Sequence, residues 1–225
     1  MYAQTATFHK TRKLTMLAAM STIAYVLMVV GRIPMVLFLK YDPKDIVITF
    51  AGFLFGPLSA MTISLVVSLV EMFTVSDTGI IGFVMNVLST CAFACTAAVF
   101  YKKKQTLPSA VAGLVTGTLL MTAIMLLWNY LITPFFLGVL RSDVVALLLP
   151  AFLPFNLVKG GLNATLTLLL YKPLVRALRA ACLLPPREEE GAACAARSLS
   201  LGVMLTAGVV LLTCVLVVLV FQGIL

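Results

Sequence analysis

Long apolar runs alternate with short polar segments along most of this chain. In chain order, the runs cover residues 14–30, 46–70, 80–101, 109–137, 144–171 and 199–221. About 20 apolar helical residues cross the hydrocarbon core of a bilayer, because a helix rises about 1.5 Å per residue. The runs are continuous rather than alternating, which argues against a transmembrane β-barrel. The pattern therefore predicts an all-α, polytopic membrane protein whose helices satisfy their own backbone groups in lipid.

The run 46–70 raises a question of topology, because Gly56-Pro57 interrupts it. It could be one kinked helix or two crossings. The next run, 80–101, ends in three lysines, Lys102 to Lys104. Two crossings place these lysines in the cytoplasm, as the positive-inside rule requires, and one crossing does not. We therefore predict a short second helix over 46–55, about 15 Å long. Only protein or a cavity can cover such a helix, and interrupted helices often border a binding site.

The basic residues support six crossings with both ends of this core in the cytoplasm. Eleven of the 16 Lys and Arg residues then lie inside, four lie outside, and Lys159 lies within the membrane. The predicted organisation has four parts. They are a cytoplasmic N-terminal tail (1–13), a six-helix substrate-binding membrane domain (14–179), a polar linker (180–198) and an additional C-terminal transmembrane helix (199–225).

Composition narrows the class of protein further. Hydrophobic residues make up 62% of the chain and charged residues only 11%, which excludes an ordinary soluble globular domain. The net charge of +8 comes from clusters in short loops. We therefore expect contact with a lipid bilayer and no binding of nucleic acid.

The stretch FLPFNLVKGGLN (152–163) places polar residues inside an apolar run. Asn156, Lys159 and Asn163 are spaced three and four residues apart, so a helix presents them on one face. A lysine within a membrane segment indicates a functional site by default. The alternatives are a lysine that extends to the membrane interface or one that pairs with Glu71.

Other polar residues are expected at the same, outer level of the membrane. Asn129 and Thr133 are spaced for one helix face in WNYLIT, Glu71 ends the run 46–70, and Asn86 lies in the outer half of 80–101. Asn129 could instead form hydrogen bonds between helices, and Glu71 could be a structural partner of Lys159. The convergence predicts a polar site, with Asn129, Asn156, Lys159, Thr133, Glu71 and Asn86 as candidate residues.

Signals for catalysis or metal binding are weak. The one histidine, His9, lies in the tail, and the sequence contains no phosphate-binding Walker motif. Cys91 and Cys95 are spaced for one helix face, but helix packing explains them better than metal ligation. Asp42 and Asp45 are expected in a turn and at a helix N-cap. We predict neither an enzyme nor a resident cofactor or metal.

Several motifs in the same order resemble one family of membrane proteins. They are KYDPKDI, GFLFGP, VSDTGIIGF, WNYLITP, LPFNLVKGGLN and LLLYKPL, and they extend over about residues 12–179. This set resembles the riboflavin-specific S component of energy-coupling-factor (ECF) transporters. The resemblance implies a six-helix vitamin-capture subunit of a bacterial cell membrane. It would work with a transmembrane coupling protein and two cytoplasmic ATPase subunits.

The resemblance also implies roles for particular residues. Substrate contacts would fall on Asn129, Asn156 and Lys159, and the 33–45 loop would cover the outer pocket. Amide groups can match the carbonyl and N–H groups of the riboflavin ring, because asparagine offers both donors and acceptors. The alternatives are an S component for another vitamin or for FMN, a lipid-modifying membrane enzyme, or a purely structural subunit. The C-terminal apolar segment, 199–221, lies outside the family pattern.

Overall fold

The computed structural model describes residues 2–36, 38–180 and 201–221. Its elements in chain order are α1 (Tyr2–Gly31), β1 (Ile33–Val36), β2 (Leu39–Tyr41), α2 (Lys44–Phe55), α3 (Pro57–Thr74), α4 (Gly79–Thr90), the π-helix η1 (Cys91–Cys95), α5 (Thr96–Lys104), α6 (Leu107–Leu137), α7 (Arg141–Leu147), the π-helix η2 (Leu148–Phe152), α8 (Leu153–Ala180) and α9 (Leu201–Phe221). The expected all-α, multi-pass architecture is confirmed, with one short hairpin added.

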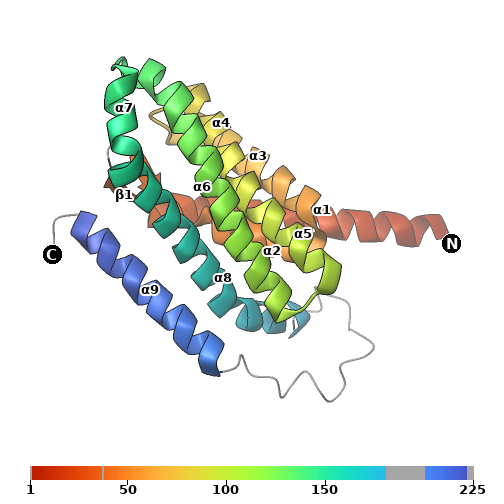
Figure 1. The fold of residues 1–225 in the computed structure, drawn as a ribbon. Helices are drawn as coiled ribbons and strands as arrows, with labels where there is room; N and C mark the ends of the chain where they lie inside the picture. The colour runs from red at the N-terminus through yellow and green to blue at the C-terminus, as the bar shows by residue number, and fades with distance from the viewer. Residues whose placement is uncertain (1, 37, 181–200, 222–225) are drawn as a thin grey trace.

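Within the described residues, five helical stretches are long and apolar enough to cross a membrane. They are Thr11–Gly31, Pro57–Thr74, Gly79–Lys104, Leu107–Leu137 and Arg141–Tyr171. The third continues through η1 and the fifth through η2, so each π-helix is a wide turn within a longer span. In the bundle, α6 packs against α5 on one side and α8 on the other (Figure 1).

Glycines bring α6 into close contact with its neighbours. A Cβ added at Gly117 would lie 2.7 Å from the Phe93 carbonyl oxygen of η1, and one at Gly113 would lie 2.9 Å from the Ala97 carbonyl oxygen of α5. Small residues let the backbones of membrane helices approach in this way. The close packing fixes α6 relative to the stretch that contains α4 and α5.

The interruption at Gly56-Pro57 separates two helices, as predicted. Gly56 has φ of 92°, a value that favours glycine, and Pro57 occupies the first turn of α3. α2 returns alongside α3, since Lys44 at the start of α2 contacts Glu71 near the end of α3. α2 has 12 residues, which span about 18 Å. It packs against α1, α3, α5 and α8, so protein covers its backbone.

Aromatic side chains close the end of the bundle where α2 finishes. The rings of Phe53 and Tyr101 have centroids 4.6 Å apart, and the Tyr101 and Tyr171 hydroxyl groups form a hydrogen bond. The three lysines at the end of α5 follow directly. The candidate residue Lys159 lies toward the other end of the bundle, beside Asp45 at the start of α2.

At that other end, a β-hairpin connects α1 to α2, where the sequence predicted only a loop. β1 and β2 are antiparallel, with Ile33 opposite Tyr41 and a register irregularity between Pro34 and Val36. Leu39 and Tyr41 are buried in a cluster with Phe152 and Phe155 at the junction of η2 and α8. The hairpin is therefore packed onto the bundle.

The predicted terminal segments differ in how far they are described. α1 begins at Tyr2, so most of the segment expected as a tail continues the first helix. Residues 181–198 of the expected linker lie outside the described residues. α9 packs along α8 (Figure 1), and the Cys214 Sγ lies 3.0 Å from the position of a Cβ at Gly161. Its described apolar part, Ala207–Val220, is shorter than the five long spans.

Candidate functional site

Four of the predicted polar residues line one cavity between α4, α6 and α8. Asn86 comes from α4, Asn129 from α6, and Asn156 and Lys159 from α8. The rest of the lining consists of Leu39, Lys40, Met85, Ser89, Met125 and Phe155. The volume is about 20 Å³, which suffices for about one water molecule. We call this space the deep cavity.

Two of these asparagines are held by hydrogen bonds within their own helices. Asn129 Nδ2 donates to the Met125 carbonyl at 2.7 Å, and Thr133 Oγ1 donates to Asn129 Oδ1 at 2.9 Å. Asn156 Nδ2 donates to the Phe152 carbonyl at 2.8 Å. An amide group has two N–H donors, so each side chain keeps one N–H for another partner. Thr133 lines a neighbouring small cavity, and its contact with the site is through Asn129.

Lys159 is neutralised by a carboxylate that the sequence analysis placed elsewhere. Its Nζ lies 3.6 Å from Asp45 Oδ2 and 3.5 Å from Ser89 Oγ. Asp45 was expected as an N-cap or turn residue, but Pro43 is the N-cap of α2 and Asp45 lies in the first turn. The N-cap expectation was therefore wrong. A buried carboxylate requires such a partner, because an isolated buried charge is strongly unfavourable.

Hydrogen bonds fix Asp45 on both of its oxygens. Thr90 Oγ1 donates to Oδ1 at 2.6 Å, and Asn163 Nδ2 donates to Oδ2 at 3.1 Å. Tyr41 from the hairpin donates its hydroxyl to Asn163 Oδ1 at 3.0 Å. Burial, together with the Asp45 and Asp42 carboxylates, raises the pKa of Tyr41 above its ordinary value, so this hydroxyl keeps its proton. The network thus joins α2, α4, α8 and the hairpin.

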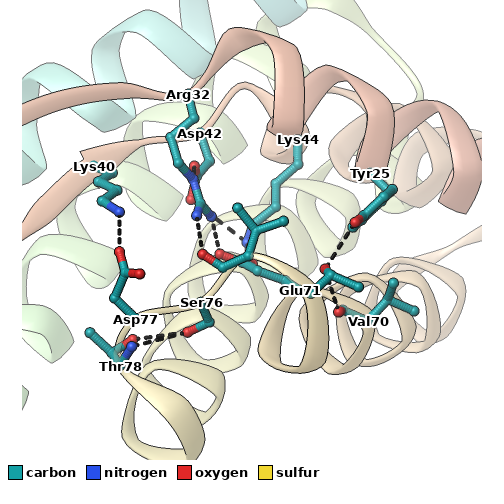
Figure 2. Close-up of polar contacts among 12 residues, drawn as sticks. Tyr25, Arg32, Lys40, Asp42, Lys44, Val70, Glu71, Ser76, Asp77 and Thr78 are labelled. Atoms are coloured by element: carbon teal, nitrogen blue, oxygen red, sulfur yellow. Dashed lines mark hydrogen bonds and ion pairs between the residues drawn. The ribbon is translucent and has the colours of Figure 1, made fainter.

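A second charged group joins the two residues that flank the hairpin, the start of α2 and α3 (Figure 2). It comprises Arg32, Asp42, Lys44 and Glu71, and we call it the Glu71 cluster. Glu71 accepts hydrogen bonds from both Arg32 and Lys44, Arg32 Nε donates to Asp42 Oδ1 at 2.8 Å, and Lys44 Nζ lies 3.7 Å from Asp42 Oδ2. The suggested pairing of Glu71 with Lys159 is therefore wrong, since Glu71 pairs with two other cations.

Burial and charge act in opposite directions on Arg32. Burial lowers its pKa, but the Asp42 and Glu71 carboxylates outweigh this effect and raise the pKa above its ordinary value. Arg32 therefore remains a cation, and the two cations and two carboxylates of the Glu71 cluster balance.

An open vestibule adjoins the deep cavity. Its lining consists of Arg32, Phe38, Lys40, Asp42, Glu71, Ser76, Asp77, Thr78, Met85 and Asn86, and its volume is about 300 Å³. Lys40 and Asp77 form an exposed ion pair at 2.5 Å (Figure 2). The hydrogen bond from Lys40 and its positive charge lower the pKa of Asp77. Lys40, Met85 and Asn86 line both spaces.

The hairpin stands between these spaces. Leu39 lines the deep cavity and Phe38 lines the vestibule and the small cavity beside Trp128 and Thr133. The Phe38 ring packs edge-on against Phe136 of α6, with centroids 5.6 Å apart. A displacement of Phe38 and Leu39 would join the spaces into one pocket of the size that small-molecule ligands occupy.

Several residues of the site were not among those predicted from the sequence. Ser89 follows Asn86 by three residues and lies on the same face of α4, so helix spacing could have identified it. The adjacent charges Lys44 and Asp45 at the start of an apolar run were a second usable signal. Among the described residues, no group of three or more His, Cys, Asp or Glu residues is arranged to hold a metal ion.

Comparisons with known proteins show which proteins this chain is similar to. The family model described as "ECF transporter, substrate-specific component" matches residues 12–171. The chain is 27% identical to the riboflavin transporter RibU of Staphylococcus aureus (strain TCH60), over 75% of this chain and 93% of that protein. It is 30% identical to the riboflavin transporter RibU of Streptococcus thermophilus (strain ATCC BAA-250 / LMG 18311), over 73% of this chain and 83% of that protein.

A third relative and a solved structure are also similar to this chain. The chain is 28% identical to the riboflavin transporter FmnP of Bacillus subtilis (strain 168), over 67% of this chain and 85% of that protein. A solved structure, titled "Structure and mechanism of the S component of a bacterial ECF transporter", superposes with a TM-score of 0.65. The two chains are 28% identical, and the superposition covers 76% of this chain and 99% of the chain in the solved structure.

Proposed function

Because the chain belongs to the family of substrate-specific components of ECF transporters, we propose that it captures riboflavin in the deep cavity for ATP-driven uptake by partner subunits. As a substrate-binding subunit it is not an enzyme. Three relatives that carry the name riboflavin transporter, each 27–30% identical to this chain, support riboflavin as the ligand.

One observation carries the proposal: Asn86, Asn129, Asn156 and Lys159 reach one cavity from three helices. The flavin ring has a polar edge of alternating carbonyl and N–H groups, which free amide and ammonium donors can match. Met85, Met125 and Phe155 supply the apolar surface that a flat ring requires. Glu71 and Thr133 are proposed to act indirectly, Glu71 through the hairpin and Thr133 through Asn129.

Ligand entry requires movement of the hairpin. The deep cavity holds about 20 Å³, whereas pockets for such ligands hold about 300–1,000 Å³. We propose that the hairpin acts as the lid, because Leu39 and Lys40 line the deep cavity while Phe38 and Lys40 line the vestibule. The vestibule is then the entrance.

The proposed setting is a bacterial cell membrane with the N-terminus in the cytoplasm. The distribution of basic residues supports this orientation, since the six crossings predicted from the sequence assign eleven Lys and Arg residues to the cytoplasmic side and four to the outside. The partners are a transmembrane coupling protein and two cytoplasmic ATPase subunits, supplied by other chains.

A direct test is the identification of the bound small molecule. The full chain, purified in detergent from cells grown without added vitamin, should carry flavin at close to equimolar amounts. Release by denaturation, followed by absorbance and mass spectrometry, identifies the ligand. A different vitamin in the released fraction would reassign the substrate, and a chain that neither carries flavin nor binds added riboflavin would refute the proposal.

We further propose that α9 is an accessory transmembrane helix and that residues 14–179 bind the ligand. Leu211 and Cys214 of α9 pack against the buried cluster around α8, but neither lines the deep cavity or the vestibule. A chain that ends at Arg179 should insert and bind riboflavin within about threefold of the full chain, since lipid can replace an apolar helix face. Equilibrium titration of both chains measures this, and loss of binding by a folded, truncated chain would place α9 in the site.

A further inference from the structure

Every cation at the candidate site has a carboxylate partner. Lys159 of the deep cavity pairs with Asp45, and Lys40 of the shared wall pairs with Asp77. In the Glu71 cluster, two cations meet two carboxylates. The deep cavity, the vestibule and these partners therefore contain four cations and four carboxylates, and their charges cancel.

From this balance we infer that the site selects uncharged ligands, and that Asp45 sets this selectivity by neutralising Lys159. The inference rests on the proposed function and deepens it, because it states which form of a flavin the site accepts. Asp45 does not line the cavity and acts through Lys159, so it is a positioning residue.

The geometry prevents Lys159 from serving a ligand as a free cation. Asp45 is completely buried and cannot move away, since Thr90 and Asn163 hold its two oxygens at 2.6 and 3.1 Å. Lys159 keeps donor capacity, because an ammonium group has three N–H donors. The ion pair therefore offers a hydrogen bond to a carbonyl or hydroxyl oxygen without a net positive charge.

A phosphorylated ligand meets a large obstacle in such a site. A phosphate monoester carries about −1.5 to −2 charges at neutral pH. To enter, it would lose its hydration, and burial of a charge without a counter-charge is strongly unfavourable. A phosphate that stays in the open vestibule gains no net positive charge either, because the cations there are paired as well.

The test compares riboflavin with riboflavin 5′-phosphate (FMN) on the full chain and on Asp45→Asn. The amide keeps a similar shape and can still accept from Thr90, but it leaves Lys159 uncompensated. We expect the wild type to bind FMN at least about tenfold more weakly than riboflavin, a difference of about 1.4 kcal/mol. In Asp45→Asn, the ratio of the two affinities should shift toward FMN by at least about tenfold.

Asp143→Asn is the matched control, since it makes the same change of acid to amide at an exposed residue of α7 that lines neither the deep cavity nor the vestibule. Water and salt screen the charge of an exposed carboxylate. The affinity ratio should shift by less than about threefold. A purely structural effect of Asp45→Asn would weaken both ligands equally and leave the ratio unchanged, which would overturn the inference.

A measurement on the wild type decides the matter if Asp45→Asn does not fold. The second phosphate pKa is about 6, so FMN carries less charge at pH 5.5 than at pH 7.5, whereas riboflavin stays neutral. FMN affinity relative to riboflavin should rise as the pH falls through about 6. Equal affinities, or a ratio independent of pH, would overturn the inference while riboflavin capture stands. Failure to bind either flavin would instead refute the proposed function.

Discussion

Lys159→Met and Asn156→Leu should each weaken riboflavin binding by at least about tenfold. Each variant removes a hydrogen bond in a desolvated site, which costs about 1–3 kcal/mol, or about 5–150-fold in affinity. Asn129→Leu should behave alike, since Asn129 lines the same cavity. Fluorescence titration of riboflavin against the purified variants measures the change.

Two further variants separate binding from stability. Lys159→Met alone leaves Asp45 buried without its cation, so a double variant, Lys159→Met with Asp45→Asn, removes both charges and limits the loss of stability. Lys103→Met is the control for loss of a lysine, because Lys103 is exposed at the end of α5. If the Lys159→Met and Asn156→Leu variants fold and bind riboflavin with near-native affinity, these polar residues hold helices together rather than bind the ligand.

Glu71→Gln should lower the free energy of unfolding by about 3–5 kcal/mol. Glu71 is the shared acceptor of Arg32 and Lys44, and Lys44 is completely buried. Removal of the carboxylate leaves two cations beside the single carboxylate of Asp42. Breakage of a buried ion pair by removal of one partner is costly for this reason.

Unfolding by a denaturing detergent, followed by a spectroscopic probe, measures this loss. Addition of Lys44→Met to Glu71→Gln should restore much of the stability, because Arg32 and Asp42 then balance. Asp77→Asn should cost less than about 1 kcal/mol, as expected for an exposed pair. Equal losses in Glu71→Gln and Asp77→Asn would contradict a structural role for the Glu71 cluster.

The local sequence pattern was sufficient to predict the helices and the residues on one face of the candidate site. Gly56-Pro57 correctly indicated two helices in one apolar run, and the spacing of Asn156 and Lys159 correctly placed both on one side of α8. Such signals depend on residues within a few turns of each other. They do not depend on how the helices pack.

The partners of the charged residues needed the three-dimensional structure. Asp45 lies 118 residues from Asn163, and Lys44 lies 27 residues from Glu71. Helix spacing shows which face is polar, but close packing at glycines such as Gly117 decides which faces meet. Glu71 was therefore assigned the wrong lysine, and Asp45 was assigned to a cap.

The short helix α2 has a consequence for the order in which the chain is assembled in the membrane. At 12 residues it is too short to cross a bilayer of about 30 Å by itself, and Lys44 and Asp45 oppose its entry into lipid. Its partners leave the ribosome later: Glu71 with α3, and Lys159 and Asn163 only with α8. A newly made α2 thus depends on downstream helices for its place. We therefore expect the proposed substrate site to be among the last parts of the protein to mature during synthesis.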